Sequence, residues 1–326
     1  MEIDEVYKRI QKYSSGDLTK ALENASDINQ KHKRNGDTLL HITCRLGRKD
    51  LVQILIESFH ANPEIANNDG KRPLHEASQN DHLDCVEYLL ERKVCVDSLK
   101  RADWTSLMLA AVKSSLNLIK VLIDYGASTN VRNKDGWTPI HIAVRSGRIE
   151  IVSYFLTIDS TLWETRSNNG RSILHTACIH GHCEMVKYLL RKTAISVHLK
   201  DSCGLNPLMD AVKGGSVDII DLLVTNGANI NDTDNLGKSC IHIAAQANQA
   251  DVIKHLIKHH NVDINAQTTV GLSTALHIAC KEHLKNIVKT LLELGANPAL
   301  EDSRNRKAEE IARIVDAADC LSLLTN

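Results

Sequence analysis

One short phrase returns along this chain about every 33 residues, and this repeat constrains the fold more than any other feature. Successive copies of its apolar residue are 34, 33, 33, 34, 34, 33 and 35 residues apart. These residues are Leu40, Leu74, Leu107, Ile140, Leu174, Leu208, Ile241 and Leu276. A period of this length is typical of arrays in which each unit packs only on its neighbours. The regularity therefore predicts an array of small units rather than one large core.

Each copy contains the signals for a turn followed by two short helices. Residues 133–136, Asn-Lys-Asp-Gly, form a turn signal, and Pro139 suits the first turn of a helix. Gly147 then separates this helix from a second one, expected over residues 149–156. Helices of about eight to ten residues are too short to be stable alone in water. They must bury their apolar faces on neighbouring repeats, so stability should be a property of the array.

The phrase resembles the ankyrin repeat, whose signature is Thr-Pro-Leu-His-x-Ala. The copies that carry the resemblance are residues 36–41, 71–75, 137–141, 171–175 and 274–277. The resemblance implies an all-α ankyrin-repeat solenoid of helix pairs with short β-turn fingers and terminal caps. We expect capping helices over 1–33, eight repeats over 34–300 and a degenerate capping repeat over 301–326. In the last segment, Glu309 and Glu310 replace the apolar residue and the histidine, and this polarity suits an outer face in water.

Composition excludes several functional classes. The chain has 39 Lys and Arg against 40 Asp and Glu, a net charge of −1, so it lacks the positive field of a general nucleic-acid binder. It contains no apolar run of about eighteen residues and no signal-peptide pattern at its start. We therefore expect a monomer in the cytoplasm, and also in the nucleus, with no membrane contact. The nine cysteines form no CxxC motif, and we expect them to be free thiols.

Histidines raise the question of a metal site or an enzyme. Six of the sixteen occupy one motif position, where the ring is expected to bond the backbone of the neighbouring finger: His41, His75, His141, His175, His242 and His277. His180 and His182 lie close to His175 but lack the Cys or Asp partners that zinc requires. His255 and His259 have a chelating spacing, yet two ligands do not make a site. The sequence thus predicts no metal, no cofactor and no enzyme, with a metal enzyme at residues 175–182 as the weakest alternative.

The fingers carry the residues expected to bind a partner. The position before each Thr-Pro is filled in turn by Asp37, Lys71, Trp104, Trp137, Arg171, Leu205, Lys238, Leu272 and Arg306. Trp and Arg are enriched at binding hot spots, and this row is expected to face outward. We therefore predict a partner-binding surface made of Lys71, Arg101, Trp104, Lys134, Trp137 and Arg171. The alternative is that each tryptophan folds back on its own finger and stabilises it.

Some segments of the chain contain residues that do not belong to the ankyrin repeat consensus. Residues 71–77, 84–90, 99–105 and 133–137 resemble the ankyrin repeat domain-containing protein 16 family. This resemblance implies a partner of alanyl-tRNA synthetase that binds its catalytic domain, limits serine misincorporation and accepts misactivated serine on lysines. The three acceptor positions of that family fall on Arg101, Lys134 and Glu164 here.

Of these three positions, only Lys134 carries the amine that could accept serine, with Lys100 as a neighbouring alternative to Arg101. Binding to the synthetase is therefore the firmer implication and serine capture the weaker one. The other reading of the whole chain is a generic cytosolic or nuclear adaptor for a different protein, because this fold serves many partners.

Overall fold

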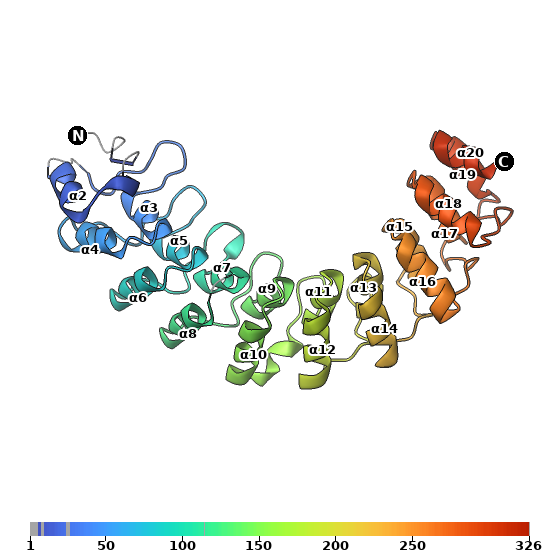
Figure 1. The fold of residues 1–326 in the computed structure, drawn as a ribbon, viewed down its shortest axis with the longest axis horizontal. Coiled ribbons are helices and arrows are strands. Elements are labelled where there is room, and N and C mark those ends of the chain that lie inside the picture. Colours follow the sequence, from blue (N-terminus) through green and yellow to red (C-terminus); the bar gives the residue numbers. More distant parts are fainter. Residues whose placement is uncertain (1–5, 8–9, 24–26, 114, 326) are drawn as a thin grey trace. The chain divides into compact units, whose positions relative to one another are not determined.

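A computed structural model describes residues 6–7, 10–23, 27–113 and 115–325. The chain divides into two compact units, Met1–Leu162 and Trp163–Asn326, called here the first and the second unit. Figure 1 shows that the helices of each unit stack in the order of the sequence.

In the part of the first unit that the structure describes, a short 3₁₀ turn and a helix precede four helix pairs. The elements are η1 (Ile10–Lys12), α2 (Ser15–Leu22), α3 (Leu39–Arg45), α4 (Lys49–Glu57), α5 (Pro73–Gln79), α6 (Leu83–Glu91), η2 (Arg101–Asp103), α7 (Ser106–Lys113), α8 (Leu116–Asp124), α9 (Pro139–Arg145), α10 (Ile149–Ile158) and η3 (Ser160–Glu164), which ends just past the boundary. Part of the predicted N-terminal cap lies outside the described residues.

The second unit consists of five further helix pairs. They are α11 (Ile173–Ile179) with α12 (Cys183–Lys192), α13 (Pro207–Gly214) with α14 (Val217–Thr225), α15 (Cys240–Gln246) with α16 (Ala250–His260), α17 (Ala275–Lys281) with α18 (Lys285–Glu293), and α19 (Ala308–Ile314) with α20 (Ala318–Leu324). Among the described residues of the chain there is no named strand, only isolated bridges in three fingers. The all-α prediction is confirmed.

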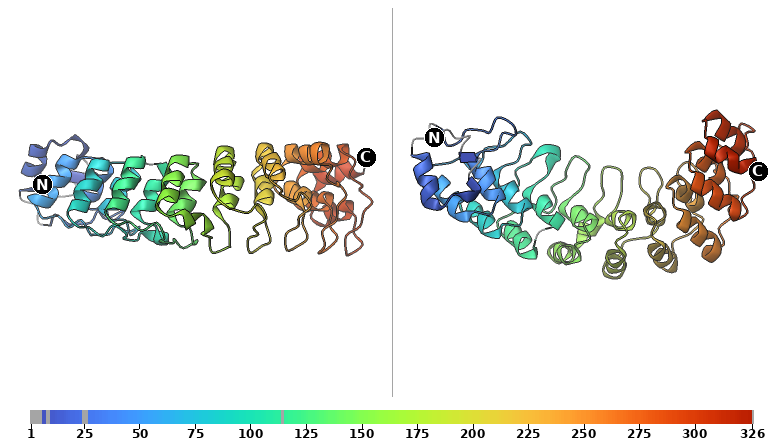
Figure 2. Two further views of the ribbon diagram at one scale, coloured as in Figure 1. Left: turned by 90° about the horizontal axis from the view of Figure 1, so that it is seen from below. Right: turned by 45° about the horizontal axis from the view of Figure 1, so that its top comes forward.

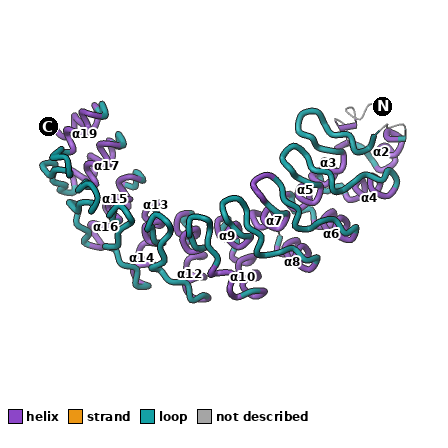
Figure 3. The backbone as a smooth tube through the Cα atoms, turned by 180° about the vertical axis from the view of Figure 1, so that it is seen from behind, coloured by secondary structure: helices purple, strands orange, loops and turns teal. Residues whose placement is uncertain are grey.

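Two layers of helices make up each unit. The first helices of the pairs, here called inner helices, pack side by side as α3, α5, α7 and α9, and as α11, α13, α15, α17 and α19. The second helices, here called outer helices, form the other layer. Figures 2 and 3 show the fingers of each unit as loops that project from one side of its helices. The core lies between the layers, and the eight periodic apolar residues are at most 2% exposed there.

The motif histidines join neighbouring fingers as the spacing predicts. In the first unit, the Thr38 backbone N–H donates to Nδ1 of His41 at 3.1 Å, so Nε2 carries the ring proton. This Nε2 donates to the carbonyl of Lys71 at 2.8 Å. The other Nε2 contacts run from His75 to Ser98, His175 to Leu205, His242 to Ala266 and His277 to Arg306, at 2.9, 3.1, 2.9 and 3.0 Å. The structural role expected of these five histidines is confirmed.

Backbone hydrogen bonds also link successive finger tips. In the first unit they run from Asn68 to Asn35, from Arg101 to Asp69 and from Lys134 to Ala102, with N···O distances of 3.0, 2.8 and 3.1 Å. In the second unit they run from Ser202 to Asn169, Asn235 to Cys203 and Ser303 to Gly271, at 2.9, 3.0 and 3.0 Å. The fingers of each unit are therefore tied together by main chain as well as by histidine.

The long gap of 35 residues before Leu276 comes from two inserted residues. The first lengthens α16: the bond from Val262 N to Leu256 O spans six residues, whereas the equivalent bond from Ala228 to Leu223 spans five. This first insertion accounts for one residue of the gap of 35. The second lies in the next finger, where the bond from Thr268 to Ser273 spans five residues instead of the usual four.

Candidate functional site

Several residues of the predicted row, among them Lys71, Trp137 and Lys238, lie against the inner helices of their own repeats, whereas Leu272 is 45% exposed. Lys71 Nζ donates to Gln79 Oε1 at 2.7 Å, and Lys238 makes the same contact with Gln246, also eight residues along, at 2.8 Å. Trp137 is half-buried, and Arg145, again eight residues along, lies 5.4 Å above its ring. Its ring also stacks on His141 at 6.2 Å. Side chains at this position thus cover the start and the end of one inner helix.

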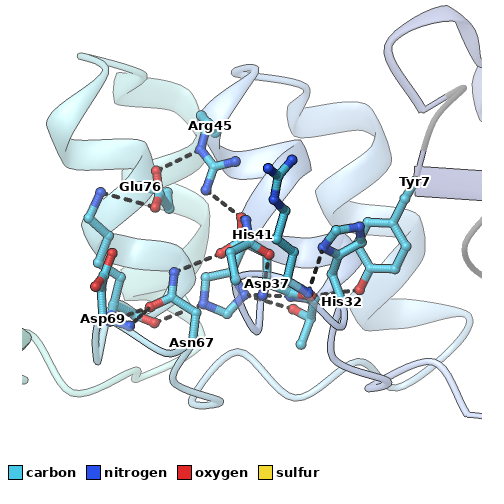
Figure 4. A network of polar contacts seen from close by, with 12 residues as sticks. Tyr7, His32, Asp37, His41, Arg45, Asn67, Asp69 and Glu76 are labelled. Atoms are coloured by element: carbon cyan, nitrogen blue, oxygen red, sulfur yellow. Dashed lines mark hydrogen bonds and ion pairs between the residues drawn. The ribbon is translucent and has the colours of Figure 1, made fainter.

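Two buried carboxylates, Asp37 and Glu76, lie in or beside this row, and Glu76 draws Lys71 inward. Glu76 on α5 is 2% exposed and lies 3.2 Å from Lys71 Nζ and 2.9 Å from Arg45 Nε. Figure 4 shows Arg45 bridging Glu76 and Asp37, which it reaches at 2.7 Å. Burial alone would raise the pKa of Asp37, but hydrogen bonds from Asn67 and Arg45 hold it below its ordinary value. Asp37 and Glu76 therefore stay ionised inside a satisfied polar network.

Arg171 has the corresponding role in the second unit. Its guanidinium forms an ion pair with Asp210 on α13, a residue that is fully buried. Burial raises the pKa of Asp210 to about 6, even though Arg171 acts in the opposite direction. The sequence predicts that Arg171 belongs to a partner surface, and in the structure this side chain also pairs with a buried acid. Its contribution to binding stays a prediction.

Two exposed cations lie at the tips of adjacent fingers in the first unit. The Arg101 side chain is 80% exposed and lies 3.6 Å from Asp69 across the tip. Lys134 is exposed on the next finger, and its backbone N–H bonds to Ala102. Asp103 has a positive φ of 61° at the position where most other fingers have glycine, and the φ of Ala102 before it is 64°. This turn without glycine projects Arg101 beside the finger of Lys134.

Lys100 lies below these tips, where its Nζ is 5.5 Å from the ring centre of Trp104. Trp104 is half-buried. Burial lowers the pKa of Lys100, and the nearby charge of Lys71 lowers it further, so more of the amine is unprotonated than in a solvated lysine. The third family position, Glu164, is exposed and belongs to the second unit.

A groove in the second unit, which the sequence did not predict, exposes several apolar side chains. It has a volume of about 540 Å³ and lies between the finger residues around 236, 270 and 304 and the inner helices α15, α17 and α19. We call it the finger groove. Three of its apolar side chains are strongly exposed: Leu236 at 52%, Val270 at 61% and Ile314 at 67%. Large side chains exposed together in this way mark an interaction surface.

The charges around the finger groove favour an acidic occupant. Four basic side chains line it, Lys238, Lys281, Arg304 and Arg306, against two acidic ones, Glu282 and Asp302. Arg306 and Asp302 neutralise each other at 2.6 Å, which leaves three cations and one carboxylate around the apolar side chains. One signal could have located this groove. The residue inserted between Thr268 and Ser273 produces the exposed Val270, and it contributes to the gap of 35.

Comparisons with known proteins agree with this architecture. A family model described as "Ankyrin repeats (3 copies)" matches residues 10–100, 93–164, 158–234 and 208–302. The chain belongs to the ankyrin repeat family. Ankyrin repeats generally act as protein-interaction modules, and the extended surfaces of such arrays serve this role.

Several larger proteins share these ankyrin repeats. The chain is 28% identical over 84% of its length to the transient receptor potential cation channel subfamily A member 1 of Homo sapiens. It is 25% identical over 88% to alpha-latrocrustotoxin-Lt1a of Latrodectus tredecimguttatus and 30% identical over 68% to palmitoyltransferase AKR1 of Lachancea kluyveri. It spans only 26%, 21% and 31% of these relatives. In the part of the chain that the structure describes, no helix has the length and hydropathy to cross a bilayer.

Proposed function

We propose that this ankyrin-repeat chain is a non-enzymatic scaffold that binds a protein segment rich in apolar and acidic residues in the finger groove. The observation that carries the proposal is the exposure of Leu236, Val270 and Ile314 around one groove. Apolar side chains of the partner cover these residues, and its carboxylates lie near Lys281 and Arg304. Such a segment gains hydrophobic contact in the centre and steering from the charged rim.

The groove predicts a selective loss of binding when its exposed apolar residues are changed. Peptides selected on the whole chain from a displayed library are expected to combine apolar side chains with Asp or Glu. Val270→Ser and Ile314→Ser should each weaken a selected peptide by about tenfold, because each removes buried apolar area from the complex. Calorimetric titration measures the affinity. Leu99→Ser is the matched control, since Leu99 is 50% exposed but lies in the first unit.

Two results would contradict this surface. If the selected peptides lacked acidic residues, the basic rim would have no role in recognition. Equal binding by the chain, by Val270→Ser and by Ile314→Ser would place the peptide elsewhere. Because Val270 and Ile314 are 61% and 67% exposed, both variants should keep the melting temperature of the parent, so a loss of binding does not reflect unfolding.

The partner that we propose is the catalytic domain of alanyl-tRNA synthetase. The support is the resemblance of residues 71–77, 84–90, 99–105 and 133–137 to the ankyrin repeat domain-containing protein 16 family, together with the exposed tips at Arg101 and Lys134. On this proposal the chain limits serine misincorporation. Direct titration with the purified catalytic domain tests it. If that domain does not bind, the chain is an adaptor for another protein, and the peptide selection above still tests the groove.

The serine-acceptor step follows ordinary acyl transfer. An unprotonated ε-amine attacks the carbonyl carbon of seryl-adenylate; a C–N amide bond forms, the C–O bond to AMP breaks, and the amine loses a proton. Lys134 is the candidate amine, and the lowered pKa of Lys100 makes it the second. Arg101 stays protonated and is a poor nucleophile, and Glu164 has no amine. Each lysine reacts once, so the chain is consumed as an acceptor and is not an enzyme.

Fewer amines should make this chain a weaker acceptor than relatives with three lysines. The chain is mixed with an editing-deficient synthetase, serine and ATP, and seryl adducts are located by peptide mass spectrometry. We expect adducts at Lys134 and a smaller yield at Lys100, because proximity to the activated acyl group sets the rate. Lys134→Arg should abolish the first and Lys100→Arg the second. Adducts spread evenly over surface lysines, or none in a complex shown to form, would contradict the acceptor role.

A further inference from the structure

Three possible metal ligands converge on the outer helices of the second unit, outside the surfaces described above. Asp221 lies on α14, and His255 and His260 lie on α16 of the following repeat. Oδ1 of Asp221 is 2.7 Å from Nε2 of His255 and 2.7 Å from Nε2 of His260. Both imidazoles thus point to one carboxylate oxygen, and the three ligand atoms lie within 4.8 Å of one another.

The surroundings hold this cluster in place. The side chains of His255 and His260 are only 17% and 14% exposed, while Asp221 is 50% exposed and keeps one side of the cluster open to water. His259 stacks on His255 with ring centres 4.6 Å apart. Asn261 then ends α16 with φ 51°, which fixes His260 on the last turn. Packing and stacking therefore fix where both rings point.

The residue inserted at the end of α16 is what completes the cluster. The helix that contains it has 11 residues, whereas α14 and α18 have 9. His260 is thereby still helical and reaches the Asp221 of the preceding repeat. The junction it spans is also the loosest of its layer. Outer helices α12 and α14, α16 and α18, and α18 and α20 pack closely, whereas α14 and α16 approach each other less.

We propose that Asp221, His255 and His260 bind one divalent transition-metal ion of the Zn²⁺ class and thereby fasten α14 to α16. Two imidazole nitrogens and a carboxylate oxygen are a donor set that suits Zn²⁺, with the fourth position taken by water. Ligand atoms about 3.3 Å apart surround a tetrahedral zinc with bonds of about 2.0 Å, so the 2.7 Å contacts open only slightly. Each ring keeps its proton on Nδ1 and presents its Nε2 lone pair. The ion acts as a structural clasp.

Metal titration of the full chain, without an affinity tag, tests the clasp. One Zn²⁺ per chain is expected to bind by calorimetry, to raise the melting temperature, and to be removed by EDTA with the original melting temperature restored. Asp221→Asn and His260→Gln should each weaken Zn²⁺ by about tenfold or more, because each removes one of three ligands. His259→Gln is the matched control and should bind as the parent does, since His259 only stacks on His255.

The absorption spectrum of bound Co²⁺ distinguishes binding at this cluster from binding at the exposed thiols Cys95 and Cys203. Bound by nitrogen and oxygen, Co²⁺ gives visible ligand-field bands without the near-ultraviolet thiolate charge-transfer band, and His260→Gln should lose these visible bands. Circular dichroism checks that each variant keeps its helices. Absence of Zn²⁺ and Co²⁺ binding to the parent would reduce the cluster to a hydrogen-bonded clasp. Unchanged affinity in Asp221→Asn and His260→Gln, or a thiolate band, would place the ion elsewhere.

Discussion

Acidification from pH 7.5 to about 4 is expected to destabilise both units by several kcal/mol, because the motif histidines are buried in the neutral form. Burial lowers the pKa of His75 in the first unit and of His175 in the second from 6.5 to about 4. A pKa difference of this size corresponds to roughly 3 kcal/mol for each histidine. His41, His242 and His277 have pKa values lowered in the same direction by burial.

The sign of this effect follows from proton uptake. Above pH 6.5 these histidines are neutral in the folded and the unfolded chain, and their contribution to stability is complete. Below pH 6.5 the unfolded chain binds protons that the folded chain does not bind until about pH 4, so stability falls through this window. In the second unit Asp210, whose pKa is raised to about 6, works in the opposite sense and offsets part of the loss between pH 6 and 3.8.

Urea unfolding followed by circular dichroism at several pH values measures this dependence. The unfolding free energy should decrease steadily between pH 6.5 and 4.5, and His75→Gln should show a shallower slope, by about one proton, over that range. His75→Gln will itself be less stable at pH 7.5, because the bond from Nε2 to the Ser98 carbonyl is lost. A flat profile for the parent chain would mean that the buried rings accept protons without loss of packing.

Arg171→Met is expected to destabilise the second unit by about 3 to 5 kcal/mol at pH 8, because it leaves the fully buried Asp210 without its cation. The cost should shrink at pH 5, below the pKa of about 6, where the carboxyl of Asp210 is protonated. Urea unfolding at the two pH values measures the difference.

The double variant Arg171→Met with Asp210→Asn is the control for this ion pair. Removing the charge along with its partner should recover most of the lost free energy at pH 8. This variant also tests the other role predicted for Arg171. If the stable double variant still binds the synthetase domain fully, Arg171 serves folding alone. A single variant as stable at pH 8 as the parent would show that Asp210 needs no cation.

The repeat spacing was sufficient to predict the helix pairs, the core positions and the histidine contacts. Two of these contacts keep one separation, because His41 lies 30 residues from Lys71 and His175 lies 30 residues from Leu205. His75, by contrast, bonds the carbonyl of Ser98, only 23 residues away. A periodic pattern therefore predicts periodic contacts. What it does not predict is the direction of a side chain, and this is why the row containing Lys71 and Trp137 was expected to face outward.

The metal-ligand cluster and the finger groove were not predicted from the sequence, because both depend on residues outside the periodic pattern. His255 and His259 looked like an incomplete pair because the third group, Asp221, lies 34 residues before His255 and only the fold brings them together. The inserted residue then puts His260, not His259, at the carboxylate. The finger groove was missed for a similar reason, since Val270 is exposed through a second insertion that the period alone did not locate.

The contacts between fingers have a consequence for how this surface can diversify. Each described histidine bond and each tip bond ends on a main-chain carbonyl, supplied by residues as different as Lys71, Ser98, Leu205 and Arg306. A carbonyl is present whatever side chain stands there. Mutation can therefore change the side chains of one finger at a time without changing how the repeats stack. A new partner can be bound in this way without a new scaffold.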